Sequence, residues 1–164
     1  MIIQHGTMIK IGVDPGINSG SIAVLATGAV DQWTIREFSK TTYFDIDKLL
    51  KAIKSASERN SERICCVIER QNPMPKQGIS STGKQMKHYG TMLGLLIANG
   101  IPYQDPVPRS WMKLYGMQKD PNETKTQWKN RLKTKAQQLY PDIKIVNANA
   151  DAILIAHIAH KFFE

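Results

Sequence analysis

The stretch MIKIGVDPG, residues 8–16, decides the fold. Its first six residues have the apolar and β-branched character of a strand, and Asp14-Pro15-Gly16 is a turn that ends it. Strand-like segments follow at 19–26 and 33–37, separated by turn residues. We therefore expect three antiparallel strands at the start of the chain.

A second informative run is ICCVI, residues 64–68, which ends at Glu69. A continuous apolar run of this length is typical of a central strand that is covered on both faces. Adjacent residues of a strand point to opposite faces, so Cys65 and Cys66 cannot easily pair with each other. We interpret them as buried, unpaired residues of a reducing compartment.

Helical spacing of apolar residues predicts helices over 45–56, 86–98, 109–115, 122–140 and 149–163. Pro102 and Pro106 weaken a strand over 101–107 and place it near an edge. Between Glu69 and the second helix, 70–83 reads as a long polar loop. The order predicts an α/β sandwich built on one mixed sheet, in a single domain spanning 1–164.

The composition restricts the kind of partner. Lys and Arg total 22 against 14 acidic residues, for a net charge of +8, which favours nucleic acid, although many soluble proteins are simply basic. No apolar run approaches the ~20 residues that cross a bilayer, and the first ten residues lack a secretory signal. We expect a soluble intracellular protein.

Three acids stand at element ends: Asp14 after the first strand, Glu69 after the apolar strand, and Asp151 in the first turn of the last helix. Each alone has a structural reading, as a turn residue, a solvated strand end and a helix-dipole partner respectively. Carboxylates that meet repel one another unless a cation neutralises them, and oxygen ligands suit Mg²⁺ or Mn²⁺. Together they predict a site for two metal ions that hydrolyses phosphodiesters.

The blocks around these acids resemble RuvC-type Holliday junction resolvases. The resemblance rests on IGVDPG at 11–16 with Ser19-Gly20, on VIE at 67–69, and on ADAILIA at 150–156. The segments PMPKQG at 73–78, Gly90 through Leu96, and PVPRSWMK at 106–113 are closest to the phage and chloroplast branch. The similarity runs from about Ile9 to Lys161.

This resemblance implies a ribonuclease H-like fold with a mixed five-stranded sheet, a homodimer, and Mg²⁺-dependent paired nicks across a four-way DNA junction. The products would carry a 5′-phosphate, and the role would be in DNA recombination and repair. It carries metal-ligand and catalytic roles onto Asp14, Glu69 and Asp151. A phage-encoded member would work in the host cytoplasm, and an organelle or nucleoid is the other expected location.

Members of this family use a fourth acid, and its position here holds Asn147, or Ala148 in the bacterial pattern. An amide oxygen ligates a cation but lacks the charge that attracts one. Three explanations stay open: Asn147 is a weaker ligand, Asp142 or Asn149 substitutes for the acid, or Asn147 replaces an original Asp.

The candidate DNA contacts are basic or polar residues after Glu69 and near the third helix, which would track the phosphate backbone. They are Arg70, Lys76, Gln77, Lys84, Lys87, Arg109 and Lys113. A mobile solvated loop is the alternative for the first of these segments. A second basic strip, Lys113, Lys119, Lys125, Lys129 and Lys133, reads equally as a solvated helix face.

Other residues have structural interpretations. Trp111 is expected in the core, His157 as a packed helix histidine, and Met92, Leu93, Leu96 and Ile97 as a core stripe. Two rival functions remain open beside the resolvase. One is an RNA-processing nuclease of the same fold, and the other is a catalytically weak junction-binding protein, which the missing fourth acid favours.

Overall fold

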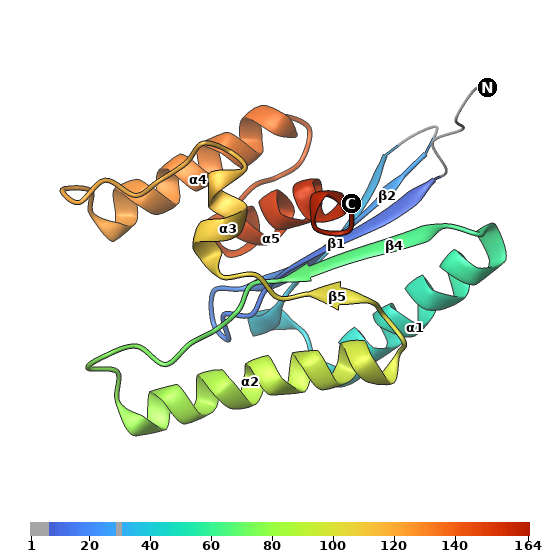
Figure 1. Cartoon of the computed structure of the whole chain (residues 1–164), viewed down its shortest axis with the longest axis horizontal. Coiled ribbons are helices and arrows are strands. Elements are labelled where there is room, and N and C mark those ends of the chain that lie inside the picture. Colours follow the sequence, from blue (N-terminus) through green and yellow to red (C-terminus); the bar gives the residue numbers. More distant parts are fainter. Residues whose placement is uncertain (1–6, 29–30) are drawn as a thin grey trace.

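One mixed sheet of five strands organises the chain, which we describe from a computed structural model over residues 7–28 and 31–164 (Figure 1). The strand order is β3-β2-β1-β4-β5. The strands are β1 (Met8–Asp14), β2 (Ser21–Thr27), β3 (Gln32–Glu37), β4 (Arg63–Ile68) and β5 (Tyr103–Gln104). The first three pair antiparallel, whereas β4 runs parallel to β1 and β5 parallel to β4. The expected hairpin start is therefore confirmed.

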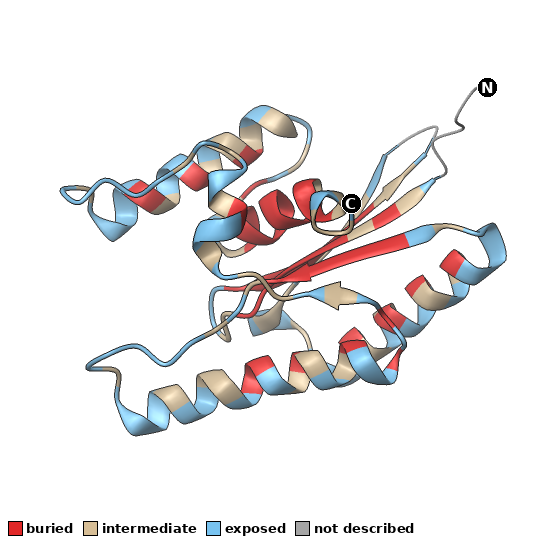
Figure 2. Ribbon diagram, in the orientation of Figure 1, coloured by how far each residue is buried: buried red, intermediate tan, exposed pale blue. Residues whose placement is uncertain are grey.

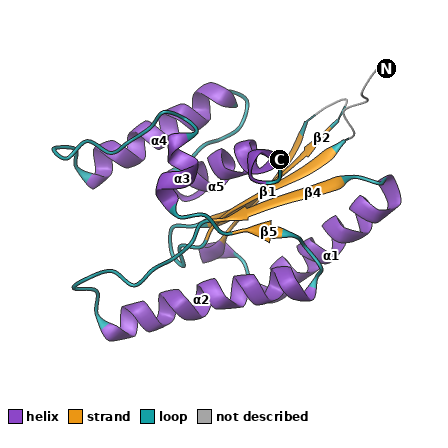
Figure 3. Cartoon of the chain, viewed as in Figure 1, coloured by secondary structure: helices purple, strands orange, loops and turns teal. Residues whose placement is uncertain are grey.

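Helices cover both faces of this sheet, as Figure 3 shows. One face carries α1 (Tyr43–Asn60) and α2 (Ile79–Ala98), and the other carries α3 (Pro108–Lys113), α4 (Lys125–Leu139) and α5 (Asn147–Ile158). Short 3-10 turns, Phe38–Lys40 and Ala159–Phe162, follow β3 and α5. None of the helices in the described ranges is long and apolar enough to cross a bilayer.

The apolar strand β4 divides the core into two halves. Cys65 packs with α4 and α5, and its neighbour Cys66 packs with α1 and α2. Both thiols are free and buried, as the alternation of a strand requires. Figure 2 shows the burial concentrated in β1, β4 and α5, so the centre of the sheet is the most enclosed part of the molecule.

The last helix, α5, lies directly on β1. Nine of its twelve residues are buried, because it sits between the sheet and α4. Its backbone comes so close at Gly12 that a Cβ atom there would stand 2.1 Å from the Ala152 carbonyl oxygen and 2.3 Å from the Ala156 nitrogen. Only glycine fits this contact.

The largest departure from the sequence prediction is the start of α2. It begins at Ile79 instead of Met86, so the loop after β4 is shorter than 70–83. Gly78 is the N-cap, and its carbonyl accepts from the Thr82 N–H at 2.9 Å. The serines and glycine of this first turn are tolerated because they are exposed. Ile97, predicted in the core, is 65% exposed, whereas Met92 and Leu96 are buried.

Other boundaries shift by less. The edge strand shrinks to Tyr103–Gln104, since the flanking prolines cannot donate to the ladder. The first and last α-helices each begin two residues earlier than expected, at Tyr43 and Asn147. Asp151 is consequently the fifth residue of α5, beyond the first turn that the sequence suggested.

Candidate active site

Asp14 and Glu69 lie side by side at the carboxyl end of the sheet. The parallel register pairs Val13 with Ile68, so the next residue of each chain segment is an acid. The Glu69 N–H donates to the Val13 carbonyl at 2.9 Å and extends this pairing by one step. Neighbouring strands are about 4.8 Å apart, so Asp14 and Glu69 follow their strands at the same level of the sheet.

Both side chains face α5. Side chains two residues apart in a strand share a face, so Asp14 lies on the side of Gly12, and Glu69 on the side of Val67. Gly12 touches the α5 backbone at Ala152, and Val67 packs in the cluster that contains α5. Asp151 precedes Ala152 and is 4% exposed. Helix α5 thus brings the third acid to the same end of the sheet.

The carboxylates are close enough to perturb one another. Burial, together with the charges of Asp151 and Glu69, raises the pKa of Asp14 to about 8. Burial also raises the pKa of Glu69 to about 7; a hydrogen bond from Trp111 opposes this shift and the charge of Asp151 adds to it. Acids with strongly raised pKa values are often found at functional sites, and here they lie together at one end of a sheet.

These shifts predict an unusual pH dependence of stability in metal-free protein. The folded state holds protons on Asp14 and Glu69 that the unfolded chain releases near pH 4. The stabilisation is therefore complete below pH 4 and is lost as the pH rises toward 7 and 8. We expect the melting temperature in EDTA to fall by on the order of 5 °C from these two groups, as measured by calorimetry. An Asp14→Asn variant should show a flatter profile, and an unchanged slope would contradict the assignment.

Three residues hold the carboxylates, namely Trp111 of α3, Lys129 of α4 and Gln71 of the loop after β4. The Trp111 indole donates from Nε1 to Glu69 Oε2 at 2.7 Å, and Gln71 Nε2 lies 3.5 Å from Glu69 Oε1. The Lys129 ammonium pairs with Asp151 Oδ2. Trp111 is buried, as predicted, but it also serves as a hydrogen-bond donor. The role of Lys129 was missed, because the sequence placed it only on a basic helix face.

The donor set fits a hard divalent cation, although the carboxylates are not closed around one. Over 7–28 and 31–164, no three His, Cys, Asp or Glu side chains are grouped closely enough to hold a metal. However, Asp151 Oδ1 is buried without a hydrogen-bond partner, and a buried anionic oxygen is costly unless it is paired. Three oxygen-donating carboxylates, one with an unsatisfied oxygen, are chemically suited to Mg²⁺ or Mn²⁺.

Lys129 neutralises Asp151 when no metal is bound, and burial of the pair makes this contact important. Burial lowers the Lys129 pKa, but the charges of Asp151, Asp14 and Glu69 outweigh it and raise the pKa overall. We expect Lys129→Met to lower the melting temperature in EDTA by on the order of 5 °C, since Asp151 would lose its counter-charge. Mg²⁺ should restore more stability to this variant than to the parent.

Lys133→Met is the matched control, because Lys133 lies one turn further along α4 and forms no ion pair with the described residues. Equal destabilisation by both substitutions would show that Asp151 does not depend on Lys129.

The candidates for a fourth ligand are less favourably placed. Asn147 is exposed as the first residue of α5. Asn149 is buried, but its amide accepts from the Val146 N–H and donates to the Lys144 carbonyl, so it caps the helix. Asp142 is exposed in the turn before α5, and Ala148 has no donor group. The Asn149 side chain is therefore already committed to local hydrogen bonds.

Most of the predicted DNA contacts are exposed. Arg70 is engaged: its guanidinium reaches Asp105 Oδ1 at 3.0 Å and remains 47% exposed. Gln77 is half-buried and bonded to Gln85. The remaining residues are exposed on the loop, α2 and α3, namely Lys76, Lys84, Lys87, Arg109 and Lys113.

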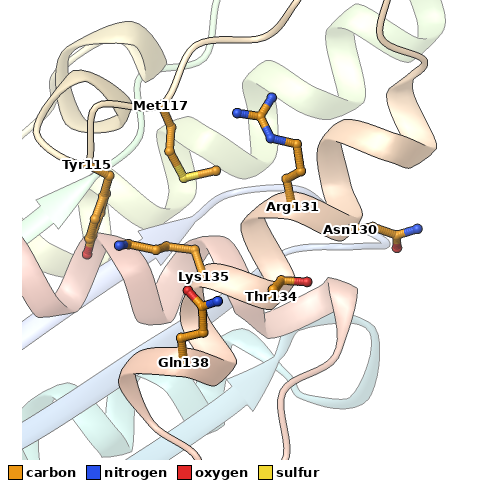
Figure 4. Close-up of a pocket in the computed structure, with 7 residues that line it drawn as sticks. All are labelled: Tyr115, Met117, Asn130, Arg131, Thr134, Lys135 and Gln138. Atoms are coloured by element: carbon orange, nitrogen blue, oxygen red, sulfur yellow. The ribbon is translucent and has the colours of Figure 1, made fainter.

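A separate shallow pocket of about 350 Å³ lies between α4 and the segment that follows α3 (Figure 4). It is lined by Tyr115, Met117, Asn130, Arg131, Thr134, Lys135 and Gln138. Lys135 points toward the Tyr115 ring, with its ammonium 6.0 Å from the ring centre. This pocket has two cations and no carboxylate, so it is distinct from the acidic site.

His157, predicted as a packed residue, bonds to the Tyr140 hydroxyl at 2.6 Å.

The fold has solved counterparts. A structure of T. thermophilus RuvC in complex with a Holliday junction substrate aligns with a TM-score of 0.58 and 17% identity, over 95% of this chain and 94% of that chain. A second Thermus thermophilus RuvC structure aligns with a TM-score of 0.52 and 19% identity, over 95% of each chain. No known family model and no curated protein matches the sequence. The chain therefore has the mixed five-stranded, ribonuclease H-like fold of RuvC.

Proposed function

We propose that the chain is a divalent-metal-dependent endonuclease that resolves four-way DNA junctions. The observation that supports this most is the convergence of Asp14, Glu69 and Asp151 on the α5 side of the sheet, where burial and the charge of Asp151 raise the pKa values of Asp14 and Glu69. The fold is that of RuvC, and a solved RuvC of this fold is bound to a Holliday junction. The net charge of +8 suits a polyanionic substrate.

In this proposal the three carboxylates would hold Mg²⁺, or Mn²⁺, and Asn147, at the exposed start of α5, would be a neutral fourth ligand. Bound Mg²⁺ supplies the positive charge that stabilises the phosphodiester transition state and lowers the pKa of water. Trp111 keeps one oxygen of Glu69 fixed, so that its carboxylate presents the same face throughout the reaction. Lys129 keeps Asp151 neutralised until the cation arrives.

The substrate would reach the acids along the exposed cations of the loop and of α2 and α3. Lys76 lies in the loop after β4, Lys84 and Lys87 belong to α2 on one face of the sheet, and Arg109 and Lys113 belong to α3 on the other face (Figure 3). Such contacts fix the position of a phosphate backbone without reading its sequence. Two equal nicks across a junction need two such sites, so we propose that a homodimer is the working form. The closer relationship to the phage and chloroplast branch remains a prediction from the sequence.

One observation favours the second candidate, a junction-binding protein with weak catalysis. Lys129 already supplies a positive charge to Asp151, and the position of the fourth acid holds an exposed Asn147. A site neutralised from within attracts Mg²⁺ less strongly than one with four free acids. The two candidates differ in whether junction strands are cut.

The test is a synthetic four-way junction labelled on each strand in turn, incubated with Mg²⁺ or with EDTA. The proposal expects paired nicks at symmetric positions, only with Mg²⁺, and little cutting of a linear duplex of the same sequence. Structured RNA offered in the same tube checks the RNA-processing alternative. Tight junction binding without any nick, in Mg²⁺ and in Mn²⁺, would reject the nuclease in favour of the binding protein.

A further inference from the structure

Three glutamines form a continuous hydrogen-bonded chain that ends on Glu69. Gln77 Nε2 donates to Gln85 Oε1 at 2.6 Å, and Gln85 Nε2 donates to Gln71 Oε1 at 2.6 Å. Gln71 Nε2 in turn approaches Glu69 Oε1 at 3.5 Å. At the far end, Gln77 Oε1 accepts from the Met74 backbone N–H at 3.2 Å. The chain thus connects a loop, a helix and a candidate metal ligand.

The direction of this chain follows from chemistry. When Glu69 is ionised, as a metal ligand must be, its carboxylate only accepts hydrogen bonds, so Gln71 turns its NH₂ group toward Glu69. Its carbonyl oxygen then faces Gln85, which must donate, and Gln85 presents its own oxygen to Gln77. Each amide therefore has one usable orientation, and the last acceptor is satisfied by a backbone N–H. A side chain that cannot both accept and donate breaks the chain at its position.

The chain is also the main attachment of the loop that follows β4. Residues 72–76 are exposed, and Met74, the one large apolar side chain among them, is 65% exposed. The loop therefore has little apolar burial to fix it. By contrast, Gln71, Gln77 and Gln85 are half-buried, and Gln85 projects from the second turn of α2, a twenty-residue helix.

We propose that Gln85 is a positioning residue, which orients Glu69 through Gln71 and anchors the loop at 71–77 through Gln77. Movement of the loop is thereby transmitted to the carboxylate, so the segment expected to meet DNA and the candidate ligand respond together. The catalytic consequence depends on the nuclease proposed above. The positioning of Glu69 does not depend on that proposal, because it involves only contacts between residues of this protein.

The Trp111 indole provides a readout that needs neither metal nor DNA. Its Nε1–H donates to Glu69 Oε2, so its NMR signal reports the position of that carboxylate. The protein has three tryptophans, and the indole N–H signal that disappears in Trp111→Phe is the one that belongs to Trp111. Amide hydrogen exchange over 71–77 reports the loop separately.

Two substitutions of Gln85 distinguish its contact with Gln71 from its contact with Gln77. Gln85→Met has a similar length and removes both contacts, so it should shift the Trp111 signal and speed exchange in the loop. Gln85→Glu still accepts from Gln77 but cannot donate to Gln71, so it should shift the Trp111 signal and leave the loop protected. Gln138→Met is the matched control, because Gln138 is exposed on α4 and forms no side-chain hydrogen bond with the described residues.

On a junction with Mg²⁺, both Gln85 variants should lower kcat by about 10- to 100-fold, as loss of a ligand-orienting partner does, with KM changed by less than about twofold. An unmoved Trp111 signal in both variants would overturn the positioning role, as would a parental kcat in both. If the parent itself nicks no strand while the signal and exchange change as expected, the nuclease proposal fails and the positioning of Glu69 stands.

Discussion

Asp14→Asn is expected to reduce junction nicking on the order of 10³-fold or more while the protein becomes more stable in EDTA. Asn keeps an oxygen that can accept from the Gly16 N–H, the contact that Asp14 Oδ1 makes at 3.3 Å. The substitution removes a buried charge whose burial and repulsion by Asp151 and Glu69 raise its pKa to about 8. Removal of this charge ends its repulsion with Asp151 and Glu69 and so stabilises the folded protein. It also removes a proposed metal ligand, so activity should fall while stability rises.

The measurements are strand nicking with Mg²⁺, junction binding by mobility shift in EDTA, and the melting temperature near pH 8. Binding should remain within about threefold of the parent, since phosphate contacts come from the basic residues. Glu58→Gln is the control, because it removes one exposed acid of α1, on the face of the sheet away from α5, with no predicted effect on nicking. If purified Asp14→Asn cuts the junction as fast as the parent, catalysis does not take place at the acidic site.

Two of the three acids could be located from the sequence because the relevant signals are local. A strand of apolar residues followed at once by an acid places that acid at a strand end, and this holds for Asp14 and Glu69. The order strand, helix, strand predicts that β4 runs parallel to β3, and hence to β1, but only the structure shows that β4 lies next to β1. The fold class was predictable for the same reason.

The partners of these acids were not predictable, because helical periodicity identifies the buried face but not what it meets. Lys129 lies 22 residues from Asp151 along the chain, and Trp111 lies 42 residues from Glu69. Trp111 is a large apolar side chain of the kind found in cores, and the neighbouring sequence does not show which group accepts its indole N–H. The glutamine chain was hidden similarly, since Gly and Ser in the first turn of α2 suggested a loop through 83.

Gly12→Ala is expected to destabilise the protein by about 3 kcal/mol or more, which lowers the melting temperature by on the order of 10 °C. The added Cβ would meet the Ala152 carbonyl oxygen at 2.1 Å and the Ala156 nitrogen at 2.3 Å, and both are backbone atoms of a helix. Neither can rotate away, so α5 must move off β1 as a unit. Gly90→Ala is the opposite control, since that position in α2 is open and Ala favours a helix by up to about 1 kcal/mol.

The same substitution tests whether the close contact at Gly12 assembles the acidic site. If α5 retreats from β1, Asp151 moves away from Asp14, and the charge repulsion that raises the Asp14 pKa weakens. Folded Gly12→Ala, held below its melting temperature, should therefore lose nicking and show a pKa of Asp14 closer to the ordinary value by NMR titration in EDTA. A variant that melts like the parent and nicks normally would mean that the helix accommodates the methyl group without displacing Asp151. In that case the spacing between α5 and β1 would not be what brings the third acid to the other two.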